Sequence, residues 1–512
     1  MRRKLAFALC FVLLASLNLS AANKTKLRFE VSLKQDLVTA PQTGRLFVIL
    51  YREEKPEPRI ALGKMGKDAP FIQAGDANQL APGKAISLDQ TAITFPVTNL
   101  SELPAGDYYV QALLDSNLDL RSQNAPGNLY SDVQKLHLDP ANRKTIQLEL
   151  SKQIAAEQLP AETELIKFVK IQSHLLSDFH HRPIYLRAGI ILPRDYNHEP
   201  TRKYPLWVRV GGFNTRYTAV QTLMGKKSDF KTNWMSGDVP GMILLQLDGA
   251  GPFGDCYQVN SANNGPYGDA ITQELIPYVE QKFRAIGQPH ARVLSGHSTG
   301  GWGSLALQIF YPDFFNGVWS SSPDPVDFRA LELIDLYEAD NAYVNEFGFE
   351  RPSERIVNGD TKLTMRREVQ IENVLGRGNS WTMSGGQWCA WNATYSPRGK
   401  DGQPMPAWNP LTGKIDHQVA EQWKKYDLRL ILEQNWQTLG PKLQGKLHIS
   451  VGDADNYFLN NAVHLLDNFL SKADPPYKGR ITYGPGKGHS WHDMSLREVM
   501  NEMKAATEPV HH

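Results

Sequence analysis

Gly296-His297-Ser298-Thr299-Gly300 is the stretch that decides how this 512-residue chain folds. Residues 291–295 before it are short and partly β-branched, which predicts a buried strand, and residues 301–310 after it predict a helix. Glycine adopts backbone conformations that other residues avoid, so the two glycines allow a sharp strand-to-helix turn with the serine at its apex. The Ser298 hydroxyl then projects beyond the sheet, and the Thr299 N–H faces the place where an oxyanion would form. A plain glycine-rich turn with a solvated serine is the alternative, which the flanking strand and helix patterns disfavour.

Length and composition describe a globular chain of more than one domain. At 512 residues the chain is too long for one core, so two domains are expected. Hydrophobic residues make up 41% and charged residues 21%, as in ordinary globular proteins. The formal net charge of +1 provides no general attraction to nucleic acid or acidic membranes. Because no basic run is interleaved with aromatic residues either, a nucleic-acid partner is not expected.

The N-terminus has the pattern of an export signal. Arg2-Arg3-Lys4 is cationic, and residues 5–14 are apolar but too short to span a bilayer. Ser20-Ala21-Ala22 offers the small residues that signal peptidase prefers, so residues 1–22 are predicted to be a signal peptide that is cleaved after Ala22. No other stretch approaches about 18 consecutive apolar residues. The mature chain is therefore expected to be periplasmic or secreted, without a membrane span.

Residues 26–150 follow a period of two. Leu27, Phe29, Val31 and Leu33 alternate with polar residues, and similar runs recur at residues 45–51, 92–97, 107–114, 133–138 and 145–150. Pro, Gly and Asn cluster between the runs, and no helical pattern interrupts them. We therefore predict an antiparallel β-sandwich domain over residues 23–150, whose role the sequence does not decide. Residues 151–167 are expected to be a linker that contains a short helix.

From residue 168 onward, predicted strands alternate with predicted helices. The strands fall at residues 184–193, 204–210, 242–247, 292–295, 317–321, 447–451 and 480–483, and the helices at residues 269–283, 301–310 and 459–472. Nearly continuous apolar strands are typical of a sheet that is covered on both faces. Residues 168–512 are therefore predicted to be an α/β domain with a mostly parallel sheet and helices on both faces. An insertion at about residues 323–445 is rich in tryptophan; most of these indoles are expected to pack its own core, although some could stack on sugar rings.

The candidate base and acid for Ser298 lie in the loops that follow the later strands. A serine hydroxyl needs a base to accept its proton, usually a histidine that a carboxylate orients. In the α/β-hydrolase fold the acid and then the histidine follow the serine along the chain. Asp455 follows the strand at residues 447–451, and His489 follows the strand at residues 480–483. Because both loops should open on the same sheet edge as Ser298, we predict a Ser298–His489–Asp455 catalytic triad.

Several nearby residues are weaker candidates. Asp453 is the alternative acid, and Asp324 or Asp327 could supply an acid from a different strand. His492 is a weaker base because it lies farther from the glycine turn, within what is expected to be the next helix. His297, beside the nucleophile, is expected to pack beneath the turn.

The oxyanion donors are expected from two loops. The Thr299 N–H is one donor, and the loop Gly211-Gly212-Phe213-Asn214 supplies the other, from the N–H of Gly212 or Phe213. A purely structural turn fits this loop equally well. The 14 histidines show no H-E-x-x-H spacing and no Gly-rich phosphate loop follows the first α/β strand, so neither a metal nor a cofactor is expected. Cys256 and Cys389, the cysteines outside residues 1–22, could form one disulfide or remain two buried thiols.

Four motifs together carry a family resemblance. Residues 264–270 (NGPYGDA), 274–278 (ELIPY), 296–301 (GHSTGG) and 488–491 (GHSW) resemble the putative esterase family, which includes esterase D-like, feruloyl and acetyl xylan esterases. The resemblance spans about residues 168–512 and thins across the insertion. It implies an α/β-hydrolase fold and ester hydrolysis by Ser298, His489 and Asp455. The chain departs from the family at Gly211-Gly212, where many members have His-Gly, and in its large insertion; both departures concern the substrate.

These observations favour an exported serine esterase that acts on a small-molecule or polysaccharide ester. A serine peptidase or an acyltransferase on the same fold is the nearest alternative, because the same triad serves all three reactions. A non-catalytic surface protein that binds glycan through the β-sandwich is an alternative of a different class. The sequence does not indicate the oligomeric state.

Overall fold

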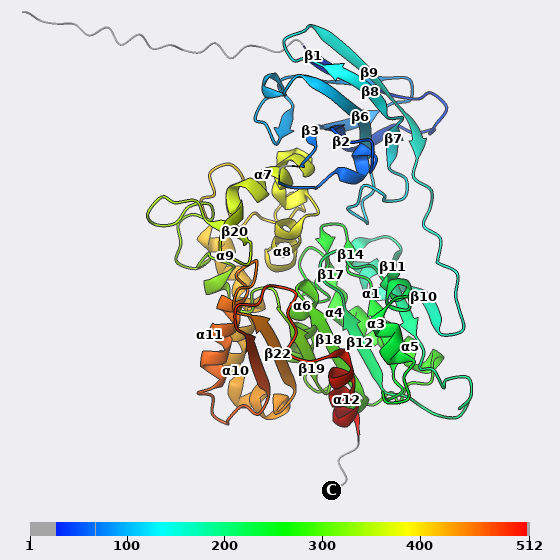
Figure 1. The fold of residues 1–512 in the computed structure, drawn as a ribbon, viewed down its shortest axis with the longest axis vertical. Helices are drawn as coiled ribbons and strands as arrows, with labels where there is room; N and C mark the ends of the chain where they lie inside the picture. Colours follow the sequence, from blue (N-terminus) through cyan, green and yellow to red (C-terminus); the bar gives the residue numbers. More distant parts are fainter. Residues whose placement is uncertain (1–26, 67, 509–512) are drawn as a thin grey trace, which may run out of the picture.

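The computed structural model describes residues 27–66 and 68–508, and the predicted signal peptide lies outside these residues. The chain forms an N-terminal unit of strands, an α/β unit, and an insertion that lies between them (Figure 1). None of the helices in the described part of the chain has the length and hydropathy that a bilayer crossing needs.

The N-terminal unit is one curved sheet. Its strands are β1 (Leu27–Leu33), β2 (Gln42–Tyr51), β3 (Phe71–Leu80), β4 (Ala85–Leu88), β5 (Ile93–Phe95), β6 (Gly106–Asp115), β7 (Leu129–Ser131), β8 (Gln134–Leu138) and β9 (Lys144–Gln153). They follow the order β4-β1-β9-β7-β6-β2-β3-β5, with β8 also on β6, and all pairings are antiparallel except β1 with β9. The alternating apolar residues of β1, β2, β6 and β9 share one buried core. Because all nine strands join a single hydrogen-bonded sheet, the pairing does not confirm the predicted two-sheet sandwich.

The α/β unit is built on an eight-stranded sheet. Its strands are β10 (Ile166–Ser173), β11 (Ile184–Ile191), β12 (Leu206–Val210), β13 (Ile243–Leu247), β18 (Arg292–His297), β19 (Val318–Ser321), β22 (Leu447–Gly452) and β23 (Arg480–Gly484). They follow the order β10-β11-β13-β12-β18-β19-β22-β23. The pairings of β11 with β10 and β13 are antiparallel, and the others are parallel. The predicted mostly parallel sheet is therefore confirmed.

Helices cover both faces of this sheet. They are α1 (His174–His180), α2 (Ala219–Leu223), α3 (Asp229–Trp234), α4 (Tyr267–Ala270), α5 (Ile276–Lys282), α6 (Thr299–Phe310), α10 (Leu428–Leu443), α11 (Asn460–Leu470) and α12 (Leu496–Thr507). Along β12, Leu206 and Val208 point into one core with α6, whereas Trp207 points into another with α3 and α12. Side chains of a strand alternate between faces, so an apolar run is buried in full only when both faces are covered.

The connection between the two units is extended. β9 ends at Gln153, and no helix forms before β10 begins at Ile166. The predicted linker helix is therefore wrong. Glu157 in this segment pairs with Arg216 (2.9 Å) and Arg187 (3.6 Å) of the α/β unit, and Pro160 lacks the N–H that a helix interior needs. These side-chain contacts hold an extended chain against the α/β unit.

The insertion buries its tryptophans in a core that is continuous with that of the α/β unit, so the expected separate core is not found. It contains the hairpin β20 (Pro352–Arg355) and β21 (Thr361–Thr364) and the helices α7 (Met365–Leu375), α8 (Gln387–Tyr395) and α9 (His417–Trp423). Its six tryptophans are all buried: Trp381, Trp388, Trp391, Trp408, Trp423 and Trp436. The rings of Trp381 and Trp408 stack at 4.5 Å. Of these six, Trp391 lines the cavity that Ser298 also lines, and the other five do not.

The insertion also docks on the N-terminal sheet. Arg45 of β2 is fully buried, pairs with Asp76 (3.0 Å) and donates to the carbonyl of Val374 in α7 (2.8 and 3.0 Å). Arg377 donates to the carbonyl of Asp115 in β6 (3.1 Å). These contacts hold α7 against the N-terminal sheet, as Figure 1 shows. Cys256 and Cys389 are both buried free thiols, so the possible disulfide does not form.

Candidate active site

Ser298 lies at the apex of a strained turn between β18 and α6. Its backbone has φ 59° and ψ −127°, in a region that residues with a side chain rarely adopt. A Cβ on Gly296 would overlap the carbonyl of Gly300, and a Cβ on Gly300 would overlap the carbonyl of Val210. Both glycines are therefore required by close backbone approach, and the predicted elbow is present.

His489 and Asp455 meet at the end of the sheet. His489 Nδ1 lies 2.8 Å from Asp455 Oδ2, and the Asp455 side chain is fully buried. Asp455 follows β22 and His489 follows β23, so their neighbouring parallel strands bring the two loops together. A carboxylate accepts, so Nδ1 carries a proton, and in the neutral ring Nε2 is then the nitrogen with the lone pair. Asp453, the alternative acid, is exposed and has no side-chain contact with His489.

Ser298 and His489 line one cavity of about 450 Å³. The Ser298 hydroxyl donates to Asp324 Oδ1 at 3.5 Å, the outer limit of a hydrogen bond, and not to His489. Since this contact is weak, rotation about the Cα–Cβ bond of Ser298 can redirect its hydroxyl.

Two further histidines lie beside His489. The His297 ring is 4.7 Å from the His489 ring and 5.3 Å from that of His492, and His297 Nδ1 contacts Ser321 Oγ at 3.0 Å. Burial, together with the imidazoles of His489 and His492, lowers the pKa of His297 to about 3. His297 is therefore neutral near neutral pH and packs beneath the elbow, as the sequence predicts. His492 is exposed and precedes α12, so its expected place within the helix is wrong.

The loop after β12 passes close to Ser298. A Cβ on Gly212 would lie 3.4 Å from the carbonyl oxygen of His297 and 3.8 Å from Ser298 Cβ, and Phe213 lines the cavity. No backbone acceptor is found in the described chain for the N–H groups of Gly212, Phe213 or Thr299. The predicted oxyanion donors are thus next to Ser298 and free to bind an anion.

Asp324 forms a buried polar centre behind Ser298. Its Oδ2 accepts from Tyr257 Oη (2.5 Å), Thr299 Oγ1 (3.0 Å), Trp391 Nε1 (3.1 Å) and Gln387 Nε2 (3.3 Å). Burial raises the pKa of the Asp324 carboxyl, while several of these hydrogen bonds oppose the shift. From its sequence position, Asp324 is expected only as an alternative triad acid. In the structure it contacts Ser298 and Thr299 but not His489. Its position directly after β19 was the available signal.

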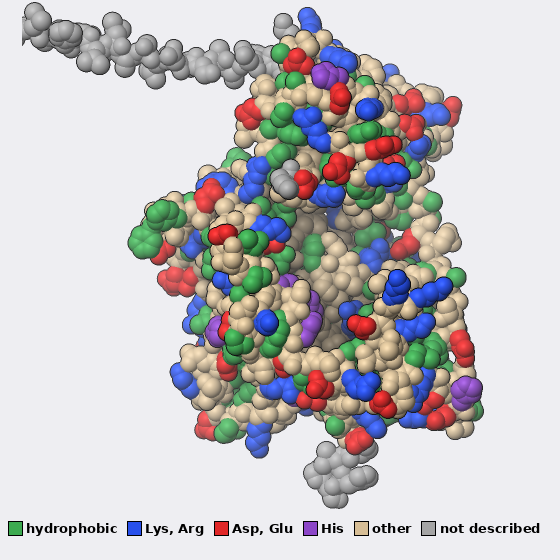
Figure 2. Space-filling model, viewed as in Figure 1, with side chains coloured by type: hydrophobic (Ala, Val, Ile, Leu, Met, Phe, Trp, Pro, Cys, Tyr) green, Lys and Arg blue, Asp and Glu red, His purple; other side chains and the backbone are tan. Residues whose placement is uncertain are grey.

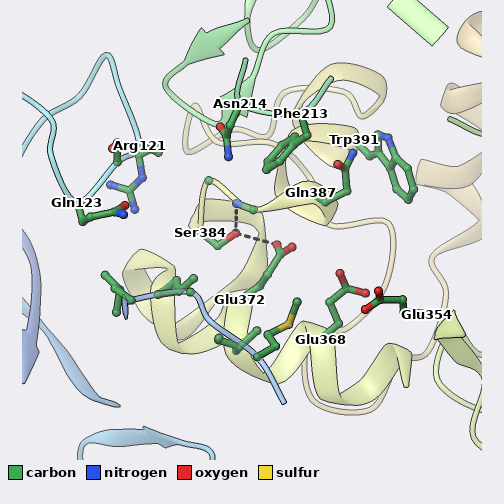
Figure 3. A pocket seen from close by; sticks show the side chains of 18 of the residues that line it. Arg121, Gln123, Phe213, Asn214, Glu354, Glu368, Glu372, Ser384, Gln387 and Trp391 are labelled. Atoms are coloured by element: carbon green, nitrogen blue, oxygen red, sulfur yellow. Dashed lines mark hydrogen bonds between the residues drawn. The ribbon is translucent and has the colours of Figure 1, made fainter. Parts of the chain in front are cut away.

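Three parts of the chain build the cavity wall. The α/β unit supplies Ser298, Phe213 and His489, and the insertion supplies Gln387 and Trp391. The N-terminal unit adds these residues: Phe47, Leu62, Gly63, Met65, Leu113, Asp115, Arg121, Ser122 and Gln123. Figure 3 shows Arg121 and Gln123 facing the insertion across this space, and the face in Figure 2 is hollowed between the two units. This contribution could not be predicted from the sequence, because it depends on how the units dock.

Comparisons with known proteins give one family match. The family model described as "Putative esterase" matches residues 185–492, a stretch that contains Ser298, Asp455 and His489. A search of curated proteins finds no match.

Solved structures also match the chain, at low identity. A ferulic acid esterase is 15% identical over 67% of this chain and 99% of its own, with a TM-score of 0.39. A fluorophosphonate-binding serine hydrolase of Staphylococcus aureus is 14% identical over 67% and 98%, with a TM-score of 0.38. An S-formylglutathione hydrolase from Agrobacterium tumefaciens is 12% identical over 67% and 94%, with a TM-score of 0.36.

Proposed function

The chain belongs to the family described as "Putative esterase", and from this membership we propose that it is a serine ester hydrolase that acts through an acyl-enzyme. The observation that carries the proposal is the pairing of His489 with buried Asp455 in the cavity that Ser298 also lines. A strained serine, an oriented imidazole and unpaired backbone N–H groups at one cavity support acyl transfer.

The first half of the reaction forms the acyl-enzyme. Ser298 Oγ attacks the ester carbonyl while His489 Nε2 takes the hydroxyl proton, and Asp455 holds the ring and stabilises the imidazolium. The carbonyl oxygen becomes an oxyanion that accepts from the N–H of Thr299 and of Phe213 or Gly212. His489 then gives its proton to the leaving alcohol, and the C–O bond of the ester breaks.

The second half releases the acid. Water takes the place of the alcohol, His489 removes its proton, and the resulting hydroxide attacks the acyl carbonyl. Collapse of the second tetrahedral intermediate returns the proton to Ser298 Oγ and frees the carboxylate. One water is consumed for each ester, and its second proton leaves with the acid, so atoms and protons balance.

The ester is proposed to be a small organic or carbohydrate-linked one, and the protein to be exported. A cavity of about 450 Å³ has the size of a small-molecule site. The cationic and apolar pattern of residues 2–22 supports export.

A panel of acetyl, feruloyl, methyl-uronate and longer acyl esters tests this function. Ser298→Ala is expected to lower kcat/KM on every ester that the wild type hydrolyses by at least about 10⁴-fold, because the nucleophile is lost. Ser471→Ala, an exposed serine, is the matched control and should retain wild-type activity. If Ser298→Ala kept more than about 1% of the wild-type rate, Ser298 would not be the nucleophile.

A further inference from the structure

One wall of the cavity is rich in carboxyl groups. Glu332 lies in the loop after β19, Glu354 in β20 and Glu368 in α7, and all three line the cavity. Figure 3 shows the carboxyl groups of Glu354 and Glu368 pointing toward one another. Among the described lining residues, Arg121 is the one Lys or Arg, and it pairs with Asp115 at 2.8 Å. The wall opposite these glutamates therefore offers them no free cation.

The buried carboxyl of Glu332 is the observation that indicates a ligand at this wall. Glu332 is only 4% exposed, and its Oε2 has no hydrogen-bond partner in the described chain. Burial raises the pKa of the Glu332 carboxyl well above its usual range, and the neighbouring charges of Glu368 and Asp324 add to this. A cation that enters with the substrate would lower this pKa and stabilise the carboxylate form, so it would be strongly bound.

The carboxyl groups of this wall have few cationic partners, and burial raises the pKa of Glu368 as it does that of Glu332. Lys362 pairs with Glu354 at 2.7 Å, whereas no Lys, Arg or His in the described chain pairs with Glu332 or Glu368. An anionic substrate group would be repelled here, and a neutral apolar group would leave the carboxyls unpaired. A positively charged donor is the group that satisfies both the charge and the hydrogen bonds.

Tyr457 joins this wall to the candidate catalytic histidine. Its ring lies 5.0 Å from the His489 ring, and the residue lines the same cavity. Burial, followed by the charges of Glu354 and Glu368, raises the pKa of Tyr457 to about 12. Tyr457 therefore stays a neutral aromatic ring between the carboxyls and the reaction centre, and aromatic faces attract ammonium groups.

We propose that Glu332, Glu354, Glu368 and Tyr457 form a subsite for an ammonium group of the substrate, which makes the enzyme selective for amine-bearing esters. The proposal rests on the ester hydrolase function proposed above. The ammonium lies among the carboxyl groups of Glu332, Glu354 and Glu368, while the ester carbonyl lies at Ser298. The acylation and deacylation steps are the same whether the acyl part or the alcohol part of the ester carries the amine.

Three activated esters of equal length test the subsite. We would compare kcat/KM for 4-nitrophenyl 6-aminohexanoate, heptanoate and hydrogen pimelate, which end in an ammonium, a methyl and a carboxylate group. Each value is divided by the rate of hydroxide-catalysed hydrolysis of that ester. The expected order is ammonium, methyl, carboxylate, with the ammonium ester at least about tenfold better than the methyl ester, equivalent to about 1.4 kcal/mol. Pentylammonium should also inhibit heptanoate hydrolysis by the wild type more strongly than 1-pentanol does.

Substitutions of the wall glutamates test whether these carboxyl groups cause the preference for the ammonium ester. Glu332→Gln and Glu368→Gln should each lower the ammonium-to-methyl ratio by about tenfold, because an amide cannot lose a proton to become a carboxylate beside the ammonium. Glu338→Gln alters an exposed glutamate of the same insertion that does not line the cavity, and it should leave the ratio unchanged. Serine-dependent heptanoate hydrolysis without an ammonium preference would overturn the subsite while the proposed function stands. Heptanoate hydrolysis that survives Ser298→Ala would instead overturn the function on which the subsite rests.

Discussion

The carboxylate of Asp455 is held from both sides. Its Oδ1 accepts the N–H of Tyr457 (2.9 Å) and of Leu459 (3.4 Å), and its Oδ2 faces His489 Nδ1 (2.8 Å). Two backbone donors fix the carboxylate plane, so the plane and tautomer of the imidazole are fixed in turn. At the residue scale, the basicity of His489 Nε2 therefore depends on one buried side chain.

A matched pair of substitutions tests this dependence. Asp455→Asn should lower kcat by about 10² to 10⁴-fold, because an amide can present an N–H to Nδ1 and favour the wrong tautomer. Asp453→Asn removes the same charge from the same loop but lies outside the contact, so its kcat should stay within about twofold of wild type. Steady-state kinetics on one ester compares the two. Equal losses in both variants would show that loop charge, and not the contact with His489, is what matters.

At the scale of elements, the N-terminus of α8 depends on a side chain from α7. The residue before α8, Gly386, has no side chain to cap it. Glu372 takes this place and accepts the N–H of Trp388 (3.0 Å), the N–H of Cys389 (3.1 Å) and the hydroxyl of Ser384 (2.7 Å). Figure 3 shows this last bond, with Gln387 and Trp391 of α8 nearby. Glu372 thereby positions the helix that supplies two donors to Asp324.

Stability should depend on pH through Glu372. Burial raises the pKa of Glu372 from about 4.5 to about 8. Between these values the folded chain keeps a proton that the unfolded chain has lost, so the stabilisation that Glu372 provides is full below pH 4.5 and declines as pH rises toward 8. The decline is at most about 1.4 kcal/mol per pH unit.

Urea unfolding of wild type and Glu372→Gln between about pH 5 and 8 measures this effect. The difference in unfolding free energy between the two proteins should shrink as pH rises. Glu338→Gln, which is exposed, should show no such trend. A difference that stayed constant or grew with pH would mean that Glu372 is ionised in the folded chain throughout the range.

Elements with strong periodicity were predictable, and elements set by their surroundings were not. β1, β11, β22 and α11 fall within a few residues of their predicted bounds, because their apolar spacing is set by the cores they face. β3 was missed: its sequence FIQAGDANQL (residues 71–80) holds Gly, Asp and Asn, which usually mark turns. It forms a strand because it pairs with both β2 and β5. Long-range pairing overrides local preference there.

At the scale of the whole molecule, the cavity is a composite of three regions distant in sequence. The positions of Ser298, Asp455 and His489 at one sheet edge follow from strand order, which the chain order of the motifs already indicates. The far wall from the N-terminal unit and the carboxyl groups of the insertion follow from docking contacts such as Arg45 with α7. Docking leaves no periodic pattern in the sequence, so the reaction class was predictable and the shape of the substrate site was not.

The central claim is that His489 activates Ser298 for attack, and the site and rate of fluorophosphonate labelling test it most directly. A fluorophosphonate reacts covalently with an activated serine, and intact-mass and peptide mass spectrometry locate the adduct. We expect one adduct on Ser298 of the wild type, formed at least about 100-fold more slowly in folded His489→Gln. A folded wild type that carries no adduct on Ser298, or one that labels no faster than His489→Gln, would contradict the account.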